Sequence, residues 1–528
     1  MDNMLSFKKC IILIFILCFT VRIGAVTQKD GLHIDEPGTF LCSTPCNLSP
    51  ERKIFKQSHK DFDLKCGKNY TASEIKKALF ESSSSPKDII KDLKMLRNSN
   101  IDRPHTNLYF SLCRIFTAGC SGLDWHEFYM RGFILNLLIF ILEFFFMFKL
   151  LALISKNEKF IACGLLISLF SLGSISNTIL VRPYSLMECF YVGATYVFLS
   201  LLISDNRLKI KTLLLYSLIS AIFLLSGYLS LVYAGLIFCI LTAYSLFKKK
   251  YCIILNTFLI MVLSICIVLI IYPSFFDFSY KNEQYLQIMQ NIEIYHSRFI
   301  SSAEIVIQFL SKYLFYKLFI ICIILFYIFE KIYEKFRPLS KQSDLNDNTK
   351  KVSLDSNYWI FLVIVSAIWA FLAMNLSWHR EERYIVPAMP ILSFLLVFFI
   401  LKIKSTVLRY FLIILYIAIP LYNIYLEITE NHSDINYLHS DVLYEFDEKK
   451  IYVLHMGETF WFYPNYYVVM PNNTIVRLEE KIPSKKFDIK SYILISDVPF
   501  PPLSEKVRTD FCFHFYPVTN YILKIPEQ

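Results

Sequence analysis

Long apolar runs separated by short polar segments make up most of the chain. A helix that crosses the hydrocarbon core of a bilayer needs about 20 mostly apolar residues, and this criterion predicts eleven membrane-spanning helices. The first run also resembles a secretory signal peptide, but ten later runs would anchor the chain, so we expect an uncleaved first span. The predicted spans are residues 10–27, 133–153, 160–178, 185–203, 212–227, 229–247, 252–272, 314–330, 358–376, 385–402 and 408–426.

Two long polar stretches interrupt this pattern, at residues 27–130 and 427–528. The second contains short β-prone runs at 450–455, 466–470 and 491–495, separated by Pro and Asn, which predicts a small mixed α/β segment. The expected fold class is therefore an α-helical polytopic membrane protein. Its transmembrane domain would span residues 1–426, with 27–130 as a large first extracytoplasmic loop, and 427–528 would form a small C-terminal extracytoplasmic domain.

The distribution of basic residues predicts the orientation of the spans. With the N-terminus inside, twenty Lys and Arg residues fall on cytoplasmic segments and six on the short outer loops. Basic residues near span ends are retained on the cytoplasmic side. Both long polar stretches and all ten histidines then lie on the outer side, where we expect any chemistry to occur.

Composition narrows the class of protein further. Apolar residues make up 55% of the 528 residues and charged residues 19%, which excludes a disordered chain and a small disulfide scaffold. Only 13 glycines are present and no glycine-rich phosphate-binding motif occurs, which argues against a nucleotide-binding enzyme. The formal charge of +10 resides largely on the cytoplasmic loops, so it reflects topology and we expect no nucleic-acid partner.

An acid pair, Asp35-Glu36, follows the first span. Adjacent carboxylates near a low-dielectric phase bind a cation, pair with a base or act as a general base. The same pair also fits an ordinary hydrated loop beside the membrane. The sequence establishes no cofactor. The acid pair is compatible with a divalent cation, although no His or Cys spacing typical of a zinc site occurs. Three outer cysteines, Cys42, Cys46 and Cys66, share one loop that oxidation could cross-link.

Other polar clusters approach the same outer face from distant parts of the chain. Arginines there break the positive-inside pattern and suit an anionic partner, since the guanidinium fork matches phosphate oxygens. Taken singly, these arginines fit snorkelling side chains and the aromatic residues fit an interfacial belt. The segments are Asp102-Arg-Pro-His-Thr-Asn-Leu-Tyr109, Trp125-His-Glu-Phe-Tyr-Met-Arg131, Arg182-Pro-Tyr184 and Trp378-His-Arg-Glu-Glu-Arg-Tyr384.

Together these segments resemble the GT-C glycosyltransferases. The similarity extends from Asp35 to Pro390 and is greatest to the branch of protein O-mannosyltransferases and lipid A aminoarabinose transferases. The resemblance implies a multi-pass enzyme that takes a sugar from a polyprenyl-phosphate donor. The acceptor, a lipid, glycan or protein, would be modified on the non-cytoplasmic face among membrane lipids.

The resemblance also implies roles for individual residues. Asp35 would be the catalytic base, with Glu36 beside it, since a hydroxyl nucleophile needs a base. Preorganised cations would stabilise the charge that develops on the departing lipid phosphate. The residues implied to bind the donor phosphate are Arg131, Arg182, Arg380 and Arg383, and those implied to bind substrate are His105, Tyr109, Tyr184, His379, Glu382 and Tyr384.

Other interpretations stay open beside this one. The segment His379-Arg-Glu-Glu-Arg-Tyr384 is more similar to a signature of the dolichol-phosphate-mannose-dependent mannosyltransferases of the endoplasmic reticulum lumen. A bacterial cell membrane is favoured by the segments at 104–109 and 182–184, with the endoplasmic reticulum membrane as the alternative. A polyprenyl-linked sugar transporter or flippase would use the same arginines without the acid pair, and a non-enzymatic scaffold is a third class. Transporters favour internal repeats and broken helices, and the sequence indicates neither.

Overall fold

The computed structural model describes most of the helical part of the chain and several strands of its C-terminal part. The described residues are 2–27, 29, 31–33, 35–44, 68–98, 105–203, 207–276, 292–314, a few positions between 316 and 332, 358–376, 382–403, 405–430, 451–455, 470–479, 492–496, 509–515 and 518–523.

The chain divides into two compact units. The helical unit comprises Met1–Lys29, Arg103–Tyr109 and Asn136–Leu438, and the sheet unit comprises Asp30–Asp102, Phe110–Leu135 and His439–Gln528. The sequence analysis expected residues 27–130 within the membrane domain and the tail from 427 as a separate domain. By contacts, most of residues 30–135 share the sheet unit with the tail from His439, and the predicted domain boundaries stay a prediction.

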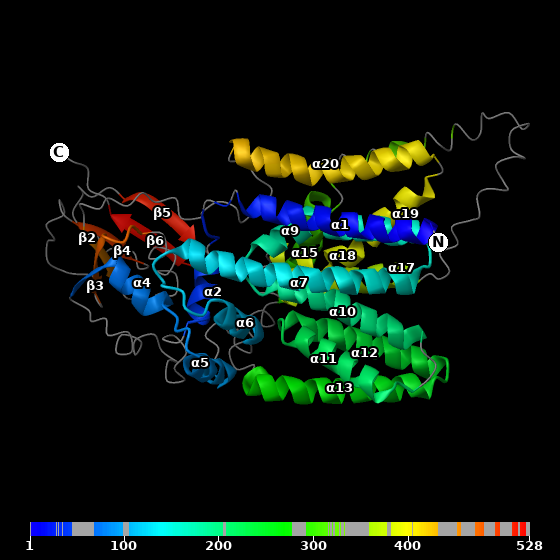
Figure 1. The fold of residues 1–528 in the computed structure, drawn as a ribbon, viewed down its shortest axis with the longest axis horizontal. Coiled ribbons are helices and arrows are strands. Elements are labelled where there is room, and N and C mark those ends of the chain that lie inside the picture. Colours follow the sequence, from blue (N-terminus) through cyan, green and yellow to red (C-terminus); the bar gives the residue numbers. More distant parts are fainter. Residues whose placement is uncertain are drawn as a thin grey trace, which may run out of the picture. The chain divides into compact units, whose positions relative to one another are not determined.

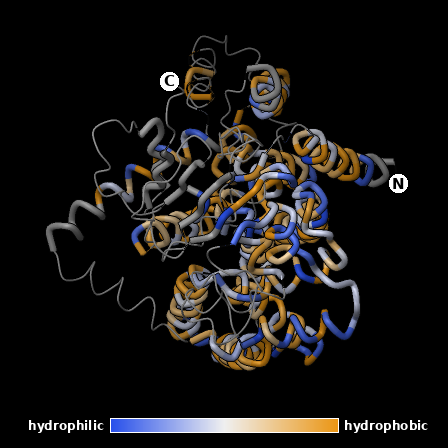
Figure 2. The backbone as a smooth tube through the Cα atoms, turned by 90° about the vertical axis from the view of Figure 1, so that its left-hand side faces the viewer, coloured by the Kyte–Doolittle hydropathy of each residue, from blue (hydrophilic) through white to orange (hydrophobic). Residues whose placement is uncertain are grey.

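The helical unit contains the long apolar helices. Among the described residues, seven helices are long and apolar enough to cross a membrane. Large side chains on their exposed faces, such as Leu13, Leu138 and Ile270, are apolar, and the helical parts of the tube in Figure 2 are largely hydrophobic. They are α1 (Asp2–Val26), α7 (Trp125–Ile154), α10 (Tyr184–Ile203), α12 (Leu229–Phe247), α13 (Tyr251–Ile271), α17 (Tyr358–Leu376) and α20 (Thr406–Glu430). Helix α7 begins in the sheet unit and belongs to the helical unit from Asn136 onwards.

These helices are those of a polytopic helical membrane protein. Helix α10 packs against α11 (Ile210–Leu224) and α12, and α11 packs against α13 (Figure 1). The predicted number of eleven spans is not reached in the described part of the chain. Helix α11 has only 15 residues, and the span expected at 314–330 falls on residues of which the structure describes only some.

One predicted span, 160–178, is bent by 53° into α8 (Glu158–Leu169) and α9 (Leu172–Ile179). The Asn157 side chain caps α8 by accepting hydrogen bonds from two backbone N–H groups, and the Ser171 hydroxyl caps α9 by accepting one from Ser174. A new cap in the middle of an apolar run explains the break, because each helix start needs acceptors for its first N–H groups. The hydropathy pattern indicated no broken helix, and the structure corrects this.

A second predicted span, 385–402, is divided into short helices. They are η6 (Val386–Ala388), α18 (Met389–Leu392) and α19 (Phe394–Lys402), and they follow η5 (Glu382–Tyr384). Pro387 and Pro390 lie at the first positions of η6 and α18, where a missing N–H costs least. Two prolines spaced by three residues thus restart the helix twice in one span. The remaining elements of this unit are η3 (Pro273–Phe276) and α15 (Ile292–Tyr313).

The sheet unit is built around a mixed six-stranded sheet with the order β1-β3-β2-β4-β6-β5. Strand β2 pairs in parallel with β3 and β4, whereas the other pairs are antiparallel. The β-prone runs at 450–455 and 491–495 coincide with β2 and β4, but the run at 466–470 ends in a bend at Met470 and its other residues lie outside the described part. The strands are β1 (Asn69–Thr71), β2 (Ile451–His455), β3 (Ile475–Glu479), β4 (Tyr492–Ser496), β5 (Thr509–Phe515) and β6 (Val518–Leu523).

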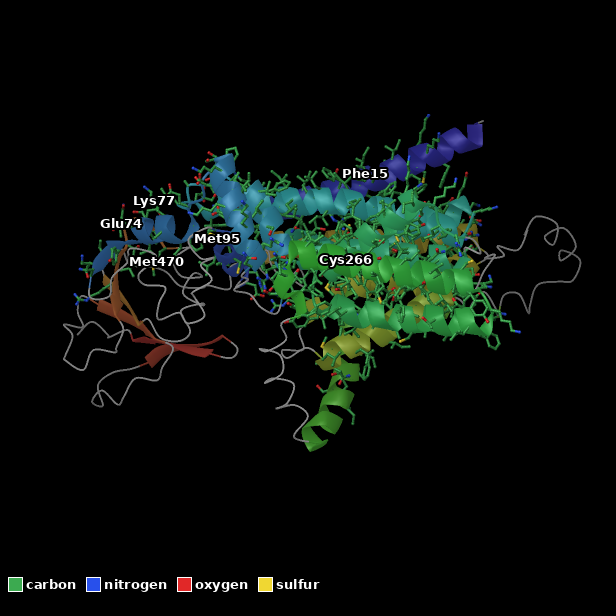
Figure 3. All side chains as sticks on the ribbon, turned by 90° about the horizontal axis from the view of Figure 1, so that it is seen from below. Phe15, Glu74, Lys77, Met95, Cys266 and Met470 are labelled. Atoms are coloured by element: carbon green, nitrogen blue, oxygen red, sulfur yellow. The ribbon has the colours of Figure 1, made fainter. Side chains whose placement is uncertain are left out.

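Strand β1 comes from the first outer loop, so this sheet joins the two polar stretches of the sequence. Helix α4 (Ala72–Phe80) follows it, and a capping box between Thr71 and Glu74 starts the helix. Lys76, beside the labelled Lys77 in Figure 3, donates hydrogen bonds to the Met470 carbonyl at 2.6 Å and to Asn472 at 3.0 Å. The short helices of the first polar stretch are α2 (Glu36–Cys42), α4, α5 (Pro86–Asn98) and α6 (Leu108–Phe116).

Candidate functional site

Asn136 of α7 fixes the turn between α9 and α10 that carries Arg182-Pro-Tyr184. Its amide donates to the backbone carbonyls of Thr178, at 3.0 Å, and Leu180, at 2.9 Å. Its Oδ1 accepts from the hydroxyls of Tyr109 and Ser185, each at 2.8 Å. The buried amide therefore uses both its donor and its acceptor capacity on one turn, which locks the backbone that presents Arg182.

The segment from His105 to Tyr109 packs against the same region. The Thr106 hydroxyl donates to the Leu225 carbonyl, and the Asn107 amide donates to the Ile271 carbonyl at 3.4 Å. These contacts attach the segment to the ends of α11 and α13, while Tyr109 attaches it to Asn136. They place the His105 ring edge-on to the Tyr184 ring, with the ring centroids 5.7 Å apart.

The late Arg-Tyr pair completes an aromatic–arginine cluster, which we define as His105, Tyr184, Arg383 and Tyr384. The Tyr184 and Tyr384 ring centroids are 6.0 Å apart. The Arg383 guanidinium carbon lies 5.9 Å from both ring centroids, within the range of cation–π attraction. Four residues that the sequence singled out, from three distant segments, thus meet within the helical unit.

Arg182 lies in the same turn as Tyr184 and is 6% exposed. A short backbone hydrogen bond of 2.8 Å from its N–H to the Leu180 carbonyl tightens the turn. Two arginines, an imidazole and two phenols together provide cations and hydrogen-bond donors. This arrangement is chemically suited to holding an anionic headgroup such as a phosphate.

A buried charged residue that the sequence analysis missed, Arg22 of α1, packs against the bend between α8 and α9. Its guanidinium donates to the Leu169 carbonyl at 2.9 Å, which is one of the carbonyls left without a helical partner by the bend. It also donates to Ser174 at 2.8 Å and to Thr178 at 3.0 Å. The ring of Phe140 covers it at 3.8 Å. Arg22 therefore stabilises the broken span.

Two buried glutamates, Glu143 of α7 and Glu188 of α10, lie within electrostatic reach of Arg22. Asn177 donates a short hydrogen bond to Glu188 and another of 3.0 Å to the Tyr184 carbonyl. We call Arg22, Glu143 and Glu188 the intramembrane charge cluster. The sequence carried a signal for it, since each charge interrupts an otherwise apolar run, and such residues are usually functional.

The acid pair lies in the sheet unit, at the start of α2. The Glu36 carboxylate is fully buried and accepts a 2.9 Å hydrogen bond from the His33 backbone N–H. The Asp35 side chain is 25% exposed, and its carboxylate lies 3.8 Å from Nδ1 of His33. Glu36 therefore has a structural role at the helix start, whereas Asp35 remains accessible.

Arg131, also in the sheet unit, forms local contacts. It donates to Glu127, one helical turn earlier, at 2.8 Å and to the Ala118 carbonyl at 2.6 Å. These contacts connect α7 to the turn before it, and the predicted phosphate-binding role stays a prediction. Burial raises the pKa of nearby Cys120 to about 12, against the opposing charge of Arg131.

The structure describes the remaining predicted residues only in part. His379 and Arg380 lie outside the described residues, and for Glu382 only the backbone in η5 is described. Among the described positions, no group of three or more His, Cys, Asp or Glu side chains could hold a metal ion. Of the three cysteines expected in one outer loop, Cys42 is buried in α2, and Cys46 and Cys66 fall outside the described part.

Comparison with known proteins gives no relative for this chain. No family model matches the sequence, and no curated protein and no solved structure matches it. Function is therefore inferred from the geometry of the helical unit and from the motifs.

Proposed function

We propose that the chain is an integral-membrane glycosyltransferase that takes a sugar from a polyprenyl-phosphate donor. The observation that carries the proposal is the aromatic–arginine cluster, which brings His105, Tyr184, Arg383 and Tyr384 together from three separate segments. In this proposal, Arg182 and Arg383 hold the lipid phosphate. As the bond from sugar to phosphate breaks, they stabilise the negative charge on the leaving group. A bacterial cell membrane is the proposed location, with the endoplasmic reticulum membrane as the alternative.

Asp35 is the proposed general base, in preference to Glu36. A base must reach the acceptor hydroxyl, and the Asp35 side chain is 25% exposed, whereas Glu36 is buried and already accepts the His33 N–H. Replacing Glu36 by Gln keeps an acceptor oxygen for that N–H. We therefore expect Asp35→Asn to abolish transfer and Glu36→Gln to reduce it less.

The test is transfer from a panel of labelled polyprenyl-phosphate sugars by the purified full chain. Arg182→Gln and Arg383→Gln should each lower turnover about 100-fold or more, the scale of losing one preorganised charge stabiliser. Arg207→Gln, an exposed arginine between α10 and α11, is the matched control and should retain activity. Asp124→Asn, whose carboxyl is 62% exposed, is the control for Asp35→Asn. Transfer that survives both Arg182→Gln and Arg383→Gln would contradict the phosphate assignment.

The bend of 53° between α8 and α9 favours a second candidate function, a transporter of a polyprenyl-linked sugar. Broken helices that line a binding site are typical of transporters. Proteoliposomes loaded with the labelled lipid would separate the two functions. Movement of the lipid between leaflets without release of polyprenyl phosphate would favour the transporter, whereas release that depends on an acceptor favours the transferase.

A further inference from the structure

The charges of the intramembrane charge cluster do not balance if all three groups are ionised. Arg22 is fully buried, Glu143 is 2% exposed and Glu188 is 1% exposed. One guanidinium and two carboxylates would leave one net negative charge. An uncompensated charge in a low-dielectric interior is strongly unfavourable. A compact arrangement that keeps these three groups must therefore gain one positive charge or lose one negative charge.

The hydrogen bonds of the two carboxyl groups indicate where the missing charge resides. Glu188 Oε2 accepts from Asn177, while Oε1 of Glu188 and Oε1 of Glu143 are buried without a hydrogen-bond partner in the described part of the chain. The two buried carboxyl groups are close enough to influence each other electrostatically. Two carboxylates this close repel each other, whereas a single shared proton converts the repulsion into a hydrogen bond.

We propose that Glu143 and Glu188 form a proton-binding site inside the helical unit and hold one proton between them. With Arg22 the cluster then carries no net charge. A metal ion fits this position poorly, because the Arg22 guanidinium lies within electrostatic reach of the two carboxyl groups and repels cations. A proton needs no ligand shell and occupies the one donor position that the two carboxyl groups lack.

The groups that face this site from the surrounding helices do not remove the imbalance. Among the described residues, the other titratable groups at this site are thiols, Cys18 on α1 and Cys189 on α10. Helix α9 contributes neutral groups, the Ser174 hydroxyl and the Asn177 amide. Each of these groups can donate or accept a hydrogen bond, and none carries a positive charge. The proton is therefore the neutralising species.

The proton-binding site is connected to the candidate functional site through one side chain. The Asn177 amide donates both to Glu188 and to the Tyr184 carbonyl at 3.0 Å. A change in the charge of Glu188 changes the strength of the first hydrogen bond, since bonds to ionised acceptors are about twice as strong. Loss of the proton therefore affects, through Asn177, the turn that carries Arg182. The existence of the site does not depend on the proposed glycosyltransferase function.

Infrared spectroscopy of the purified full chain tests this proposal directly. The carbonyl stretch of a protonated carboxyl group is separated from the amide and carboxylate bands. The protein is kept in an alkyl maltoside detergent, which has no ester carbonyl. The spectrum is recorded at about pH 7, where a glutamate in water is ionised. Growth with glutamate labelled with carbon-13 at the side-chain carboxyl assigns the band by its isotope shift.

Each variant has a specific expected infrared spectrum. The wild type should show one protonated glutamate band, and Glu143→Gln and Glu188→Gln should each lose it, because one guanidinium and one carboxylate already balance. Both variants keep this balance and should elute as monodisperse proteins. The control Glu158→Gln, an exposed residue at the start of α8, should retain the band. Absence of the band in the wild type, or its persistence in both single variants, overturns the proposal.

Discussion

Two arginines with no exposed surface, one in each unit, are neutralised in different ways. Arg114 of α6, in the sheet unit, forms a direct ion pair with Asp92 of α5 at 2.7 Å and donates to the Ser83 carbonyl at 2.9 Å. Arg22, in the helical unit, donates to two backbone carbonyls and two hydroxyls, all of them neutral. Its compensating charge comes from two carboxyl groups that it does not contact in an ion pair.

The difference shows that the two units compensate a buried charge in different ways. In the sheet unit, one charge is matched by one opposite charge in direct contact. In the helical unit, the guanidinium first satisfies backbone groups left by a broken helix, as a membrane interior requires. The carboxyl pair then supplies charge balance from a distance. Only the second arrangement contains a group whose proton can be gained or lost without breaking an ion pair.

The largest expected effect is that of Arg22→Met. It removes the donors for the bend and leaves Glu143 and Glu188 without a compensating charge, so we expect a loss of at least about 3–5 kcal/mol in the free energy of unfolding. Unfolding of the full chain in sodium dodecyl sulfate, followed by circular dichroism, measures it. Arg22→Lys keeps the charge without the planar fork and should lose less. A smaller loss for Arg22→Met than for Arg114→Met would contradict the comparison.

Arg114→Met should cost about 3–5 kcal/mol, because it leaves the Asp92 carboxyl buried without its partner. The double variant Arg114→Met/Asp92→Leu removes both charges and should recover most of this loss. The same unfolding measurement applies. If the double variant is as unstable as Arg114→Met, the loss comes from packing and the direct ion pair is not its cause.

Asn136→Leu tests a buried polar group that carries no charge. It removes the hydrogen bonds that Asn136 makes with the Thr178 and Leu180 carbonyls and with the Tyr109 and Ser185 hydroxyls, while the Leu180 carbonyl keeps the Arg182 N–H. We expect a loss of about 2–3 kcal/mol. Tyr109→Phe removes one hydroxyl and should cost about 1 kcal/mol. Equal losses for the two variants would show that the several hydrogen bonds of Asn136 do not together stabilise the turn between α9 and α10.

The smallest effect is expected at Lys76, a buried cation of the sheet unit that, like Arg22, donates to neutral oxygens. Burial lowers the pKa of Lys76 below its usual value, against the opposing charge of Asp124. The unfolded chain therefore holds this proton at pH values where the folded chain has released it. Stability should rise as the pH increases from the lowered pKa towards 10.5, the ordinary value for lysine.

Thermal unfolding of the wild type and two variants across this pH range measures the effect. In Lys76→Met the rise should be absent, whereas Lys77→Met, which removes an exposed neighbour, should keep it. A rise of the same size in Lys76→Met would assign the pH dependence to other groups.

The sequence predicted the parts of the molecule that local pattern determines. Apolar runs gave the positions of the long helices, and the β-prone runs at 450–455 and 491–495 coincide with β2 and β4. The bend at Phe170 was missed, because it depends on a cap at Ser171 and on Arg22, far away in the chain. Hydropathy averages over a window and does not register a single hydroxyl.

In the candidate site, too, residues in local motifs were predicted, whereas a residue whose role depends on distant partners was missed. Motifs identified His105, Tyr184, Arg383 and Tyr384, and the structure brings their side chains together. The supporting residue Asn136 was missed because a single amide within an apolar helix resembles a tolerated exception. Its importance appears only when its four partners, on the turn and on Tyr109, are known.

The pairing of β1 with β3 has a consequence for biosynthesis. Lys76 and Met470, which tie α4 to the segment before β3, are 394 residues apart, and most of the membrane helices are made between them. A ribosome releases the first outer loop long before the strand that pairs with it exists. Contacts with such large sequence separation form late. The loop must therefore remain without its sheet partner until the tail is made, and chaperones have time to bind it.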